Sequence, residues 1–252
     1  MKYREYAPAP ALRAHVACYW SLEAADSSGH RVLPDGCMDL LFDMSGCGGA
    51  SLVGAMTTAI VTPPAARVTL FGVRFLPGEA FAFTEVPARE VLDVAVPLTE
   101  IWGRRAGGLA ERVVALTDMA ARVRCLDQAL LAARPRAADA RVRRAVQTLL
   151  RAPAPVGVAA LASEAGVSER HLERAFVERV GMGPKRLGRI ARLQRLLGRI
   201  AWCPADDEAR PWATIASEFG FADQAHLARE VKALSGLTPT ALAREGMQPA
   251  WT

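Results

Sequence analysis

Apolar residues in the last hundred positions recur every three or four residues, the spacing that the buried face of an α-helix requires. Val158, Leu161 and Ala162 form such a stripe, and Gly166 ends it, because glycine adopts the left-handed conformation at low cost. Ser168 then suits the N-cap of a second helix. The buried stripe of that helix is predicted to be Leu172, Ala175, Phe176 and Val180.

The same pattern returns further along the chain. Residues 160–184 and 214–239 align with an offset of 54 residues before the central glycines and 55 after them. The second copy therefore has one extra residue in its turn, between Gly220 and Asp223. Two helices joined by a short glycine turn are typical of a helix-turn-helix unit, and the chain is predicted to contain two.

The polar faces of the second helices distinguish a DNA reader from an ordinary helical hairpin. Arginine bonds guanine bidentately, glutamine bonds adenine, glutamate accepts a hydrogen bond from cytosine, and alanine contacts the thymine methyl. For one copy alone, a solvated polar face of a helical domain is the better explanation. Two copies with matching caps, turns and an arginine at the same register favour DNA binding.

Charge along the chain supports this interpretation. Residues 136–252 contain 18 basic and 12 acidic residues, a net charge of +6, whereas residues 1–135 have a net charge of −1. A positive excess confined to the half with the repeat is what attraction to DNA phosphates requires. Between the copies, residues 184–200 predict an amphipathic helix that begins with Pro184 and can hold the two units together.

These residues resemble the AraC/XylS family of transcription regulators over about residues 139–245. The specific matches are GVSERHLERAF and GMGP in the first copy and GFADQAHLAREVK and GLTP in the second. The resemblance implies two helix-turn-helix units joined by a long helix, with recognition helices in successive major grooves of double-stranded DNA.

Carried over by position, the resemblance also implies which residues face the bases. They are Arg170, Glu173 and Arg174 in the first unit and Gln224, Ala225 and Arg229 in the second. The predicted DNA-binding set also includes Ser168, Lys185 and Lys232.

Residues 1–103 show a different pattern, with short β-favouring runs separated by PDG, GCGG and LPG turns. The expected strands are residues 16–22, 32–33, 39–44, 51–54, 59–62 and 68–75. Such runs predict an antiparallel barrel or sandwich. VLPDGCMDLLF and FGVRFLPGEAF resemble a little-studied N-terminal domain found on some of these regulators, at the position where a ligand-sensing domain often lies.

Candidate ligand-binding residues in this domain combine aromatic and charged side chains: Trp20, Asp35, Asp39, Arg74 and Phe75. Asp35 lies in a Pro-Asp-Gly turn that turn geometry alone explains. Arg74 either binds a carboxylate of an effector or pairs with Asp39. His15, His30 and Cys37 match no known metal-ligand spacing, so we expect no metal and no cofactor.

Residues 104–133 predict a long helix with an apolar stripe that includes Leu109, Val113, Leu126 and Leu130. The stripe suits packing on the chain's own β domain and suits dimerisation equally. We therefore expect an α+β protein of two domains. Its parts are a β-rich sensor at 1–103, a helical dimerisation or linker segment at 104–138 and a DNA-binding domain at 139–252.

The sequence also indicates in which cellular compartment the protein is expected. The N-terminal residues lack the apolar core of a signal peptide, and no apolar run approaches the ~18 residues of a membrane span. The five cysteines are odd in number and widely spaced. We expect a reduced cytoplasmic setting and no membrane contact.

Three functions remain open at this point. The first is a sequence-specific transcription regulator, for example an activator, that is not an enzyme and is controlled by a small-molecule effector. The second is a DNA-damage response protein that transfers alkyl groups to a cysteine, with Cys37 as the candidate nucleophile. The third is a regulator controlled by protein contact, for example with RNA polymerase or a second regulator.

Overall fold

A computed structural model describes residues 2–27, 29–45, 49–133, 138–201, 211–246 and 250. The strands are β1 (Lys2–Tyr6), β2 (Val16–Ser27), β3 (Arg31–Val32), β4 (Met38–Asp43), β5 (Ala50–Val53), β6 (Ile60–Val61), β7 (Ala65–Phe75) and β8 (Ala95–Pro97). The helices of the first half are η1 (Pro10–Leu12), α1 (Phe81–Thr84), η2 (Ala88–Glu90), α2 (Leu98–Trp102), α3 (Arg104–Ala115) and α4 (Met119–Ala132). Those of the second half are α5 (Ala140–Arg151), α6 (Val158–Ala165), α7 (Glu169–Val180), α8 (Pro184–Ala201), α9 (Trp212–Glu218), α10 (Gln224–Ser235) and α11 (Pro239–Arg244).

Six of these strands form one antiparallel sheet in the order β1-β2-β7-β4-β5-β8, and β3 pairs with β6 in a separate two-stranded ribbon. Alternation along β4 shows why one face is buried: Met38, Leu40 and Phe42 are buried and the residues between them are less so. The α+β class and the antiparallel arrangement predicted from the sequence are confirmed. β1 and β8 were not predicted.

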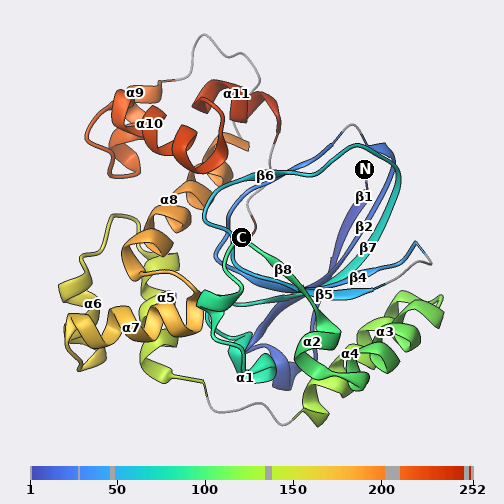
Figure 1. The fold of residues 1–252 in the computed structure, drawn as a ribbon. Coiled ribbons are helices and arrows are strands. Elements are labelled where there is room, and N and C mark those ends of the chain that lie inside the picture. Colours follow the sequence, from blue (N-terminus) through green and yellow to red (C-terminus); the bar gives the residue numbers. More distant parts are fainter. Residues whose placement is uncertain are drawn as a thin grey trace.

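Helices α2, α3 and α4 cover one face of the sheet, below it in Figure 1. The predicted single helix over 104–133 is wrong, because the chain leaves the helical conformation at Leu116 and α4 restarts at the N-cap Asp118, which accepts a hydrogen bond from the Ala121 amide. The predicted apolar stripe is buried in the chain's own core. Asp127 on α4 accepts a hydrogen bond of 2.7 Å from the Tyr19 hydroxyl, which joins this layer to β2.

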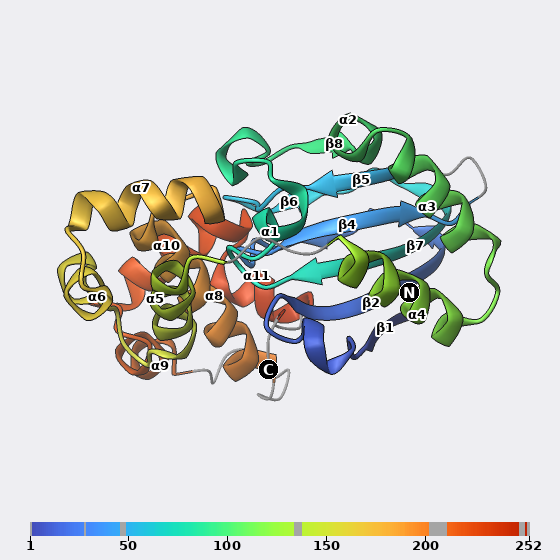
Figure 2. The same cartoon turned by 90° about the horizontal axis from the view of Figure 1, so that it is seen from below.

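The second half is helical and is organised around α8. Figure 1 shows α5, α6 and α7 towards one end of α8 and α9, α10 and α11 at the other. Buried apolar residues on α8, including Leu187, Ile190 and Leu197, fill the space between the two groups. Viewed from below in Figure 2, this helical half lies beside the sheet, and contacts described below join the two.

Residues 134–137 of the predicted segment 104–138, and residues 202–210 of the predicted DNA-binding domain, lie outside the described residues. No helix among the described residues is both long enough and apolar enough to cross a membrane.

Candidate nucleic-acid interface

The first helix-turn-helix unit follows the sequence pattern closely. Gly166 ends α6 at φ 67°, and the Val167 amide donates to the Ala162 carbonyl at 3.0 Å. The side chain of Ser168 caps α7 by accepting a hydrogen bond from the His171 amide at 3.2 Å. Only one residue, Val167, separates Gly166 from the cap Ser168, so the turn between α6 and α7 is short.

The second unit has the same plan with one added residue. The Phe221 amide donates to the Ala216 carbonyl at 2.8 Å, so Phe221 corresponds to Val167 of the first unit. The extra residue is therefore Ala222, which precedes the cap Asp223. The amide of Ala222 donates to Nδ1 of His226 at 3.2 Å, and Asp223 accepts from the His226 amide at 2.6 Å. His226 thus stabilises the longer turn.

Both recognition helices bury one face and expose the other. On α7, Leu172, Phe176 and Val180 are buried, and on α10 the buried residues include Leu227, Val231 and Leu234. All nine predicted DNA-binding residues lie on exposed positions of the helical half: Ser168, Arg170, Glu173, Arg174, Lys185, Gln224, Ala225, Arg229 and Lys232. Within the described part of the chain, Arg170, Arg174 and Arg229 form no ion pair. Their guanidinium groups are accessible to a ligand.

The net positive charge of this half suggests that the arginines of α8 contact DNA phosphates, but three of them bond to groups within the protein. Arg192 is 9% exposed, donates to the Gly220 carbonyl at 3.1 Å and lies 4.3 Å from the centre of the Phe221 ring. Arg189 forms two hydrogen bonds to Glu230 on α10, at 2.7 and 3.1 Å. Arg195 donates to the Leu149 carbonyl at the end of α5 at 3.3 Å. These three charges hold the two units on α8, which leaves fewer of them for DNA phosphates.

The turn of the second unit lies against the segment that precedes the first unit. A Cβ added to Gly220 would lie 2.6 Å from Cδ of Pro155, in the segment that leads into the first unit. Gly220 has φ 68° as well, so both the space and the backbone conformation exclude a larger residue. The second turn is therefore fixed by Pro155 on one side and by Arg192 on the other.

Four of the five predicted ligand-binding residues meet on the face of the sheet opposite α3 and α4. The Trp20 indole donates to Asp39 at 2.6 Å, and Nε of Arg74 lies 3.5 Å from carboxylate oxygens of both Asp35 and Asp39. The sequence left two roles open for Arg74, binding an effector carboxylate or pairing with Asp39. In the structure it faces the carboxylates of both Asp35 and Asp39. Nε of Arg74 is buried without a hydrogen-bond partner among the described residues.

Phe75 is not part of this cluster. It lies on the other face of the sheet, fully buried, with its ring stacked 5.3 Å from that of Phe83. Its neighbour Arg74 points the opposite way because successive side chains of a strand alternate between faces. Phe75 therefore does not share a site with the other four predicted ligand-binding residues.

Tyr3 on β1 also belongs to this neighbourhood, although the sequence did not predict it: its ring centre lies 6.1 Å from that of Trp20. No strong strand pattern marks residues 2–6, so only the pairing of β1 with β2 reveals it. The Trp20 ring covers Gly72, where a Cβ would lie 2.3 Å from the indole.

Burial controls protonation in this cluster. Burial raises the pKa of Asp39 to about 6, with the Arg74 charge acting against it and Asp35 acting with it. Burial likewise raises the pKa of the Cys18 thiol to about 12. One guanidinium faces two carboxylates here, so the cluster has no net positive charge with which to attract an anion.

The cysteine and histidine candidates lie apart. His15 bonds Glu79 at 2.7 Å, His30 lies next to the β3–β6 ribbon, and Cys37 is 3% exposed in the turn where its amide donates to Asp35. In the described ranges, no three His, Cys, Asp or Glu side chains gather as metal ligands would.

Two family models match the chain. Residues 4–97 match a family described as "Domain of unknown function (DUF6597)", and residues 161–245 match one described as "Helix-turn-helix domain". Comparison with curated proteins gives no significant match.

Solved structures give weaker likenesses. The C-terminal domain of AraT, a response regulator from Geobacillus stearothermophilus, is 21% identical with a TM-score of 0.39, over 45% of this chain and 92% of that one. ToxT from Vibrio cholerae O395 is 10% identical with a TM-score of 0.47, over 90% of this chain and 97% of that one. The same protein bound to (E)-4-(8-methylnaphthalen-1-yl)but-3-enoic acid is 10% identical with a TM-score of 0.46, over 91% and 99%.

Proposed function

We propose that this DNA-binding transcription regulator reads two successive major grooves with α7 and α10. Its C-terminal helix-turn-helix domain is of the AraC type, and its N-terminal domain matches DUF6597. The observation that carries the proposal is that both helices expose their N-terminal halves while α8 holds them together. Helix-turn-helix proteins contact base edges with this part of the recognition helix.

Arg170, Glu173 and Arg174 are proposed as the base-reading residues of α7, and Gln224, Ala225 and Arg229 as those of α10. These side chains are exposed, and each can make one of the standard major-groove contacts. Lys185 and Lys232 are proposed to contact phosphates, which position the protein without reading sequence. Because one chain carries both readers, a single protomer suffices to span grooves ~34 Å apart.

Binding of the full-length protein to sheared DNA of its own genome tests this function. We expect a small set of fragments to bind strongly, among them promoters close to its own gene, with affinity falling as salt rises. Equal binding to all fragments would contradict sequence-specific regulation. A genome-wide expression comparison with and without the protein then gives the sign of regulation, which we propose to be activation.

We further propose that an effector binds the N-terminal domain beside Trp20, Asp39 and Arg74. A partly buried network of charges costs folding free energy, so a ligand that completes its hydrogen bonds would stabilise the domain. Since two carboxylates already face Arg74, the charge balance favours a cationic effector over a carboxylate. Aromatic rings such as that of Trp20 also suit organic cations.

A thermal-unfolding screen with small amines and small carboxylates tests the effector class. An amine should raise the unfolding temperature of the native protein and have a smaller effect on Asp39→Asn. Stabilisation by carboxylates alone would overturn the cationic assignment. Contact with RNA polymerase and homodimer formation remain proposals of the same kind, for which pull-down and sedimentation of the full-length protein are the direct measurements.

A further inference from the structure

The second recognition helix ends on the N-terminal domain. The last carbonyls of an α-helix have no partner within the helix and must find donors elsewhere. In α10, the Leu234 carbonyl accepts a hydrogen bond of 2.8 Å from the amide of Ala59, and the Ser235 carbonyl accepts one of 2.9 Å from Nη1 of Arg31. Both donors belong to the β3–β6 region, more than 170 residues away in the sequence.

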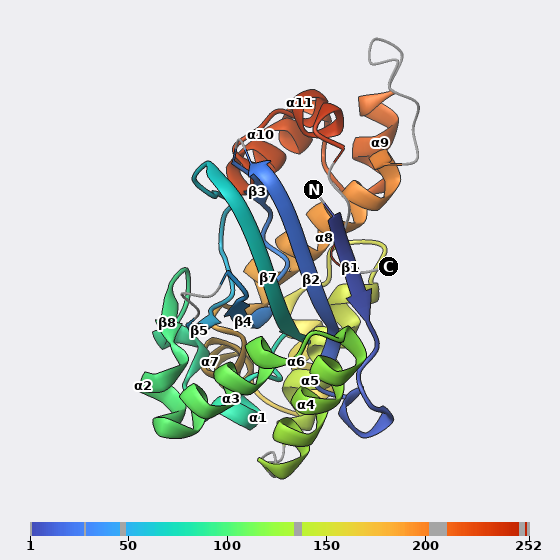
Figure 3. The same ribbon diagram turned by 90° about the vertical axis from the view of Figure 1, so that its right-hand side faces the viewer.

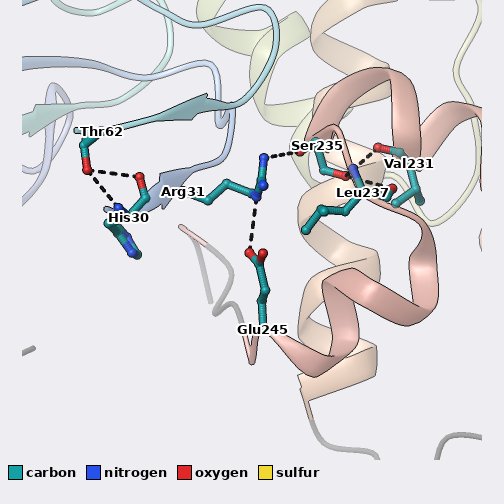
Figure 4. A network of polar contacts seen from close by, with 7 residues as sticks. All are labelled: His30, Arg31, Thr62, Val231, Ser235, Leu237 and Glu245. Atoms are coloured by element: carbon teal, nitrogen blue, oxygen red, sulfur yellow. Dashed lines mark hydrogen bonds and ion pairs between the residues drawn. The ribbon is translucent and has the colours of Figure 1, made fainter. Parts of the chain in front are cut away.

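Arg31 is held firmly enough to act as a fixed cap. Its backbone pairs with Val61 in the ribbon, and Thr62 closes the adjacent end by bonding the amide and the carbonyl of His30 at 2.9 and 3.1 Å (Figure 4). Nε of Arg31 lies 3.2 Å from Glu245, just after α11. One side chain therefore ties the ribbon to the ends of two helices.

Gly236, the residue that ends α10, is adapted to this contact. Its φ is 77°, which favours glycine, and an added Cβ would lie 3.3 Å from Nη1 of Arg31. A side chain there would press on the guanidinium.

The first recognition helix also ends on the N-terminal domain, at a different place. Glu178 pairs with Arg89 of η2, and the guanidinium of Arg179 lies 3.8 Å from the centre of the Phe81 ring on α1. At Gly181, an added Cβ would lie 3.0 Å from the Ala88 carbonyl. The C-terminal ends of α7 and α10 are both anchored, and their N-terminal halves are left exposed.

A single strand connects the two anchor points. Ala59, which lies just before β6, precedes β7 and contacts the α10 end, whereas α1 and η2 follow β7 and contact the α7 end. Figure 3 shows β7 running from the level of α10 to the level of α1. Its 11 residues, at about 3.3 Å each, span about 35 Å. That length is close to the ~34 Å between successive major grooves.

We infer that Arg31 is a positioning residue for DNA reading. Arg31 and the ribbon that carries it cap α10 from outside the DNA-binding domain. In this way the N-terminal domain sets the separation and direction of the two recognition helices. This inference rests on the proposed reading of two grooves. It predicts that Arg31 governs the spacing between the two halves of the target, and leaves the bases read within each half unchanged.

The test begins with DNA selected by the full-length native protein from a random pool, which gives the two half-sites and their preferred spacing. Affinities are then measured on a series in which that spacing is changed by one and two base pairs. We expect Arg31→Ala to reduce the preference for the best spacing by about tenfold, the scale of one charged hydrogen bond, with the base preferences of each half-site retained. Arg67→Ala, an exposed arginine of β7, is the matched control.

Two further variants make the result decisive. Glu245→Gln removes only the ion pair of a partly exposed side chain, so it should fold normally and weaken the spacing preference less than Arg31→Ala does. Arg31→Lys retains the charge without the two-pronged geometry and should restore part of the preference. An unchanged spacing preference in both Arg31→Ala and Glu245→Gln would overturn the inference while leaving the proposed function intact. Failure of the native protein to select a two-part site would overturn the proposed function and this inference with it.

Discussion

The two helix-turn-helix units share one pattern in sequence but are held in place by different contacts. In the first unit the turn closes with local backbone hydrogen bonds and the cap Ser168. The second turn keeps an equivalent backbone hydrogen bond and the cap Asp223. The inserted Ala222 lengthens it, and Arg192 from α8 and His226 from α10 add further hydrogen bonds. A duplicated element can therefore keep its core positions while acquiring a separate set of supports.

The supports differ in origin as well. Arg195 on α8 reaches the end of α5, just before the first unit, and Arg192, one turn away, reaches Gly220 in the second unit. The N-terminal domain contacts side chains at the end of α7, whereas at the end of α10 it donates hydrogen bonds to backbone carbonyls. We therefore expect the second reader to depend more on the rest of the chain.

The largest expected effects come from equivalent core leucines. Leu172 is 1% exposed and Leu227 is 0% exposed. Substituting either by alanine should cost about 2 to 5 kcal/mol, because the lost contacts leave a cavity. Urea unfolding measures the cost, and selected DNA should lose one half-site with Leu172→Ala and the other with Leu227→Ala. Loss of the same half-site by both variants would show that the units do not act separately.

Arg192→Met should have the next largest effect, about 2 kcal/mol, because the Gly220 carbonyl loses its charged donor and Phe221 loses its cationic neighbour. Hydrogen exchange should accelerate in α9 and α10 more than in α6 and α7. Arg186→Met, an exposed change on the same helix, is the control. Equal acceleration in both units would remove the distinction drawn between their supports.

The smallest effects are expected at the caps. Ser168→Ala and Asp223→Ala should each cost about 1 kcal/mol. Asp223 should cost somewhat more, because a carboxylate accepts the amide hydrogen bond at 2.6 Å, whereas the Ser168 hydroxyl accepts at 3.2 Å. Thermal unfolding of both variants beside Asp223→Ser measures the difference. A larger loss at Ser168 would mean that the first turn has the less robust support.

Sequence alone predicted what local chemistry determines. Gly166 and Gly220 mark the left-handed ends, Ser168 and Asp223 cap the next helices, and the alignment places the inserted residue correctly. The six expected strands also occur, because β-favouring runs bounded by turn residues mark locally where strands lie, even though the pairing of those strands depends on distant partners.

What sequence could not show depends on partners far along the chain. The spacing of Arg192 looks like that of a solvated arginine, and only the fold places its donor against a carbonyl 28 residues away. In the sequence, Arg31 is one basic residue of a short strand, and only the fold shows that it donates a hydrogen bond to the Ser235 carbonyl at the end of α10. Phe75 and Arg74 are neighbours in sequence, and the facing of the strand decides which of them joins the charged cluster.

The central claim is that one chain reads DNA with two helices, each at its own half-site. The most direct measurement compares DNA selected from a random pool by the native protein, by Arg174→Ala and by Arg229→Ala. We expect two conserved blocks about one helical turn apart for the native protein. Each variant should lose base preference in a different block, at a cost of about 1 to 3 kcal/mol. A single block, or the same uniform weakening of all sequences by both variants, would contradict the account.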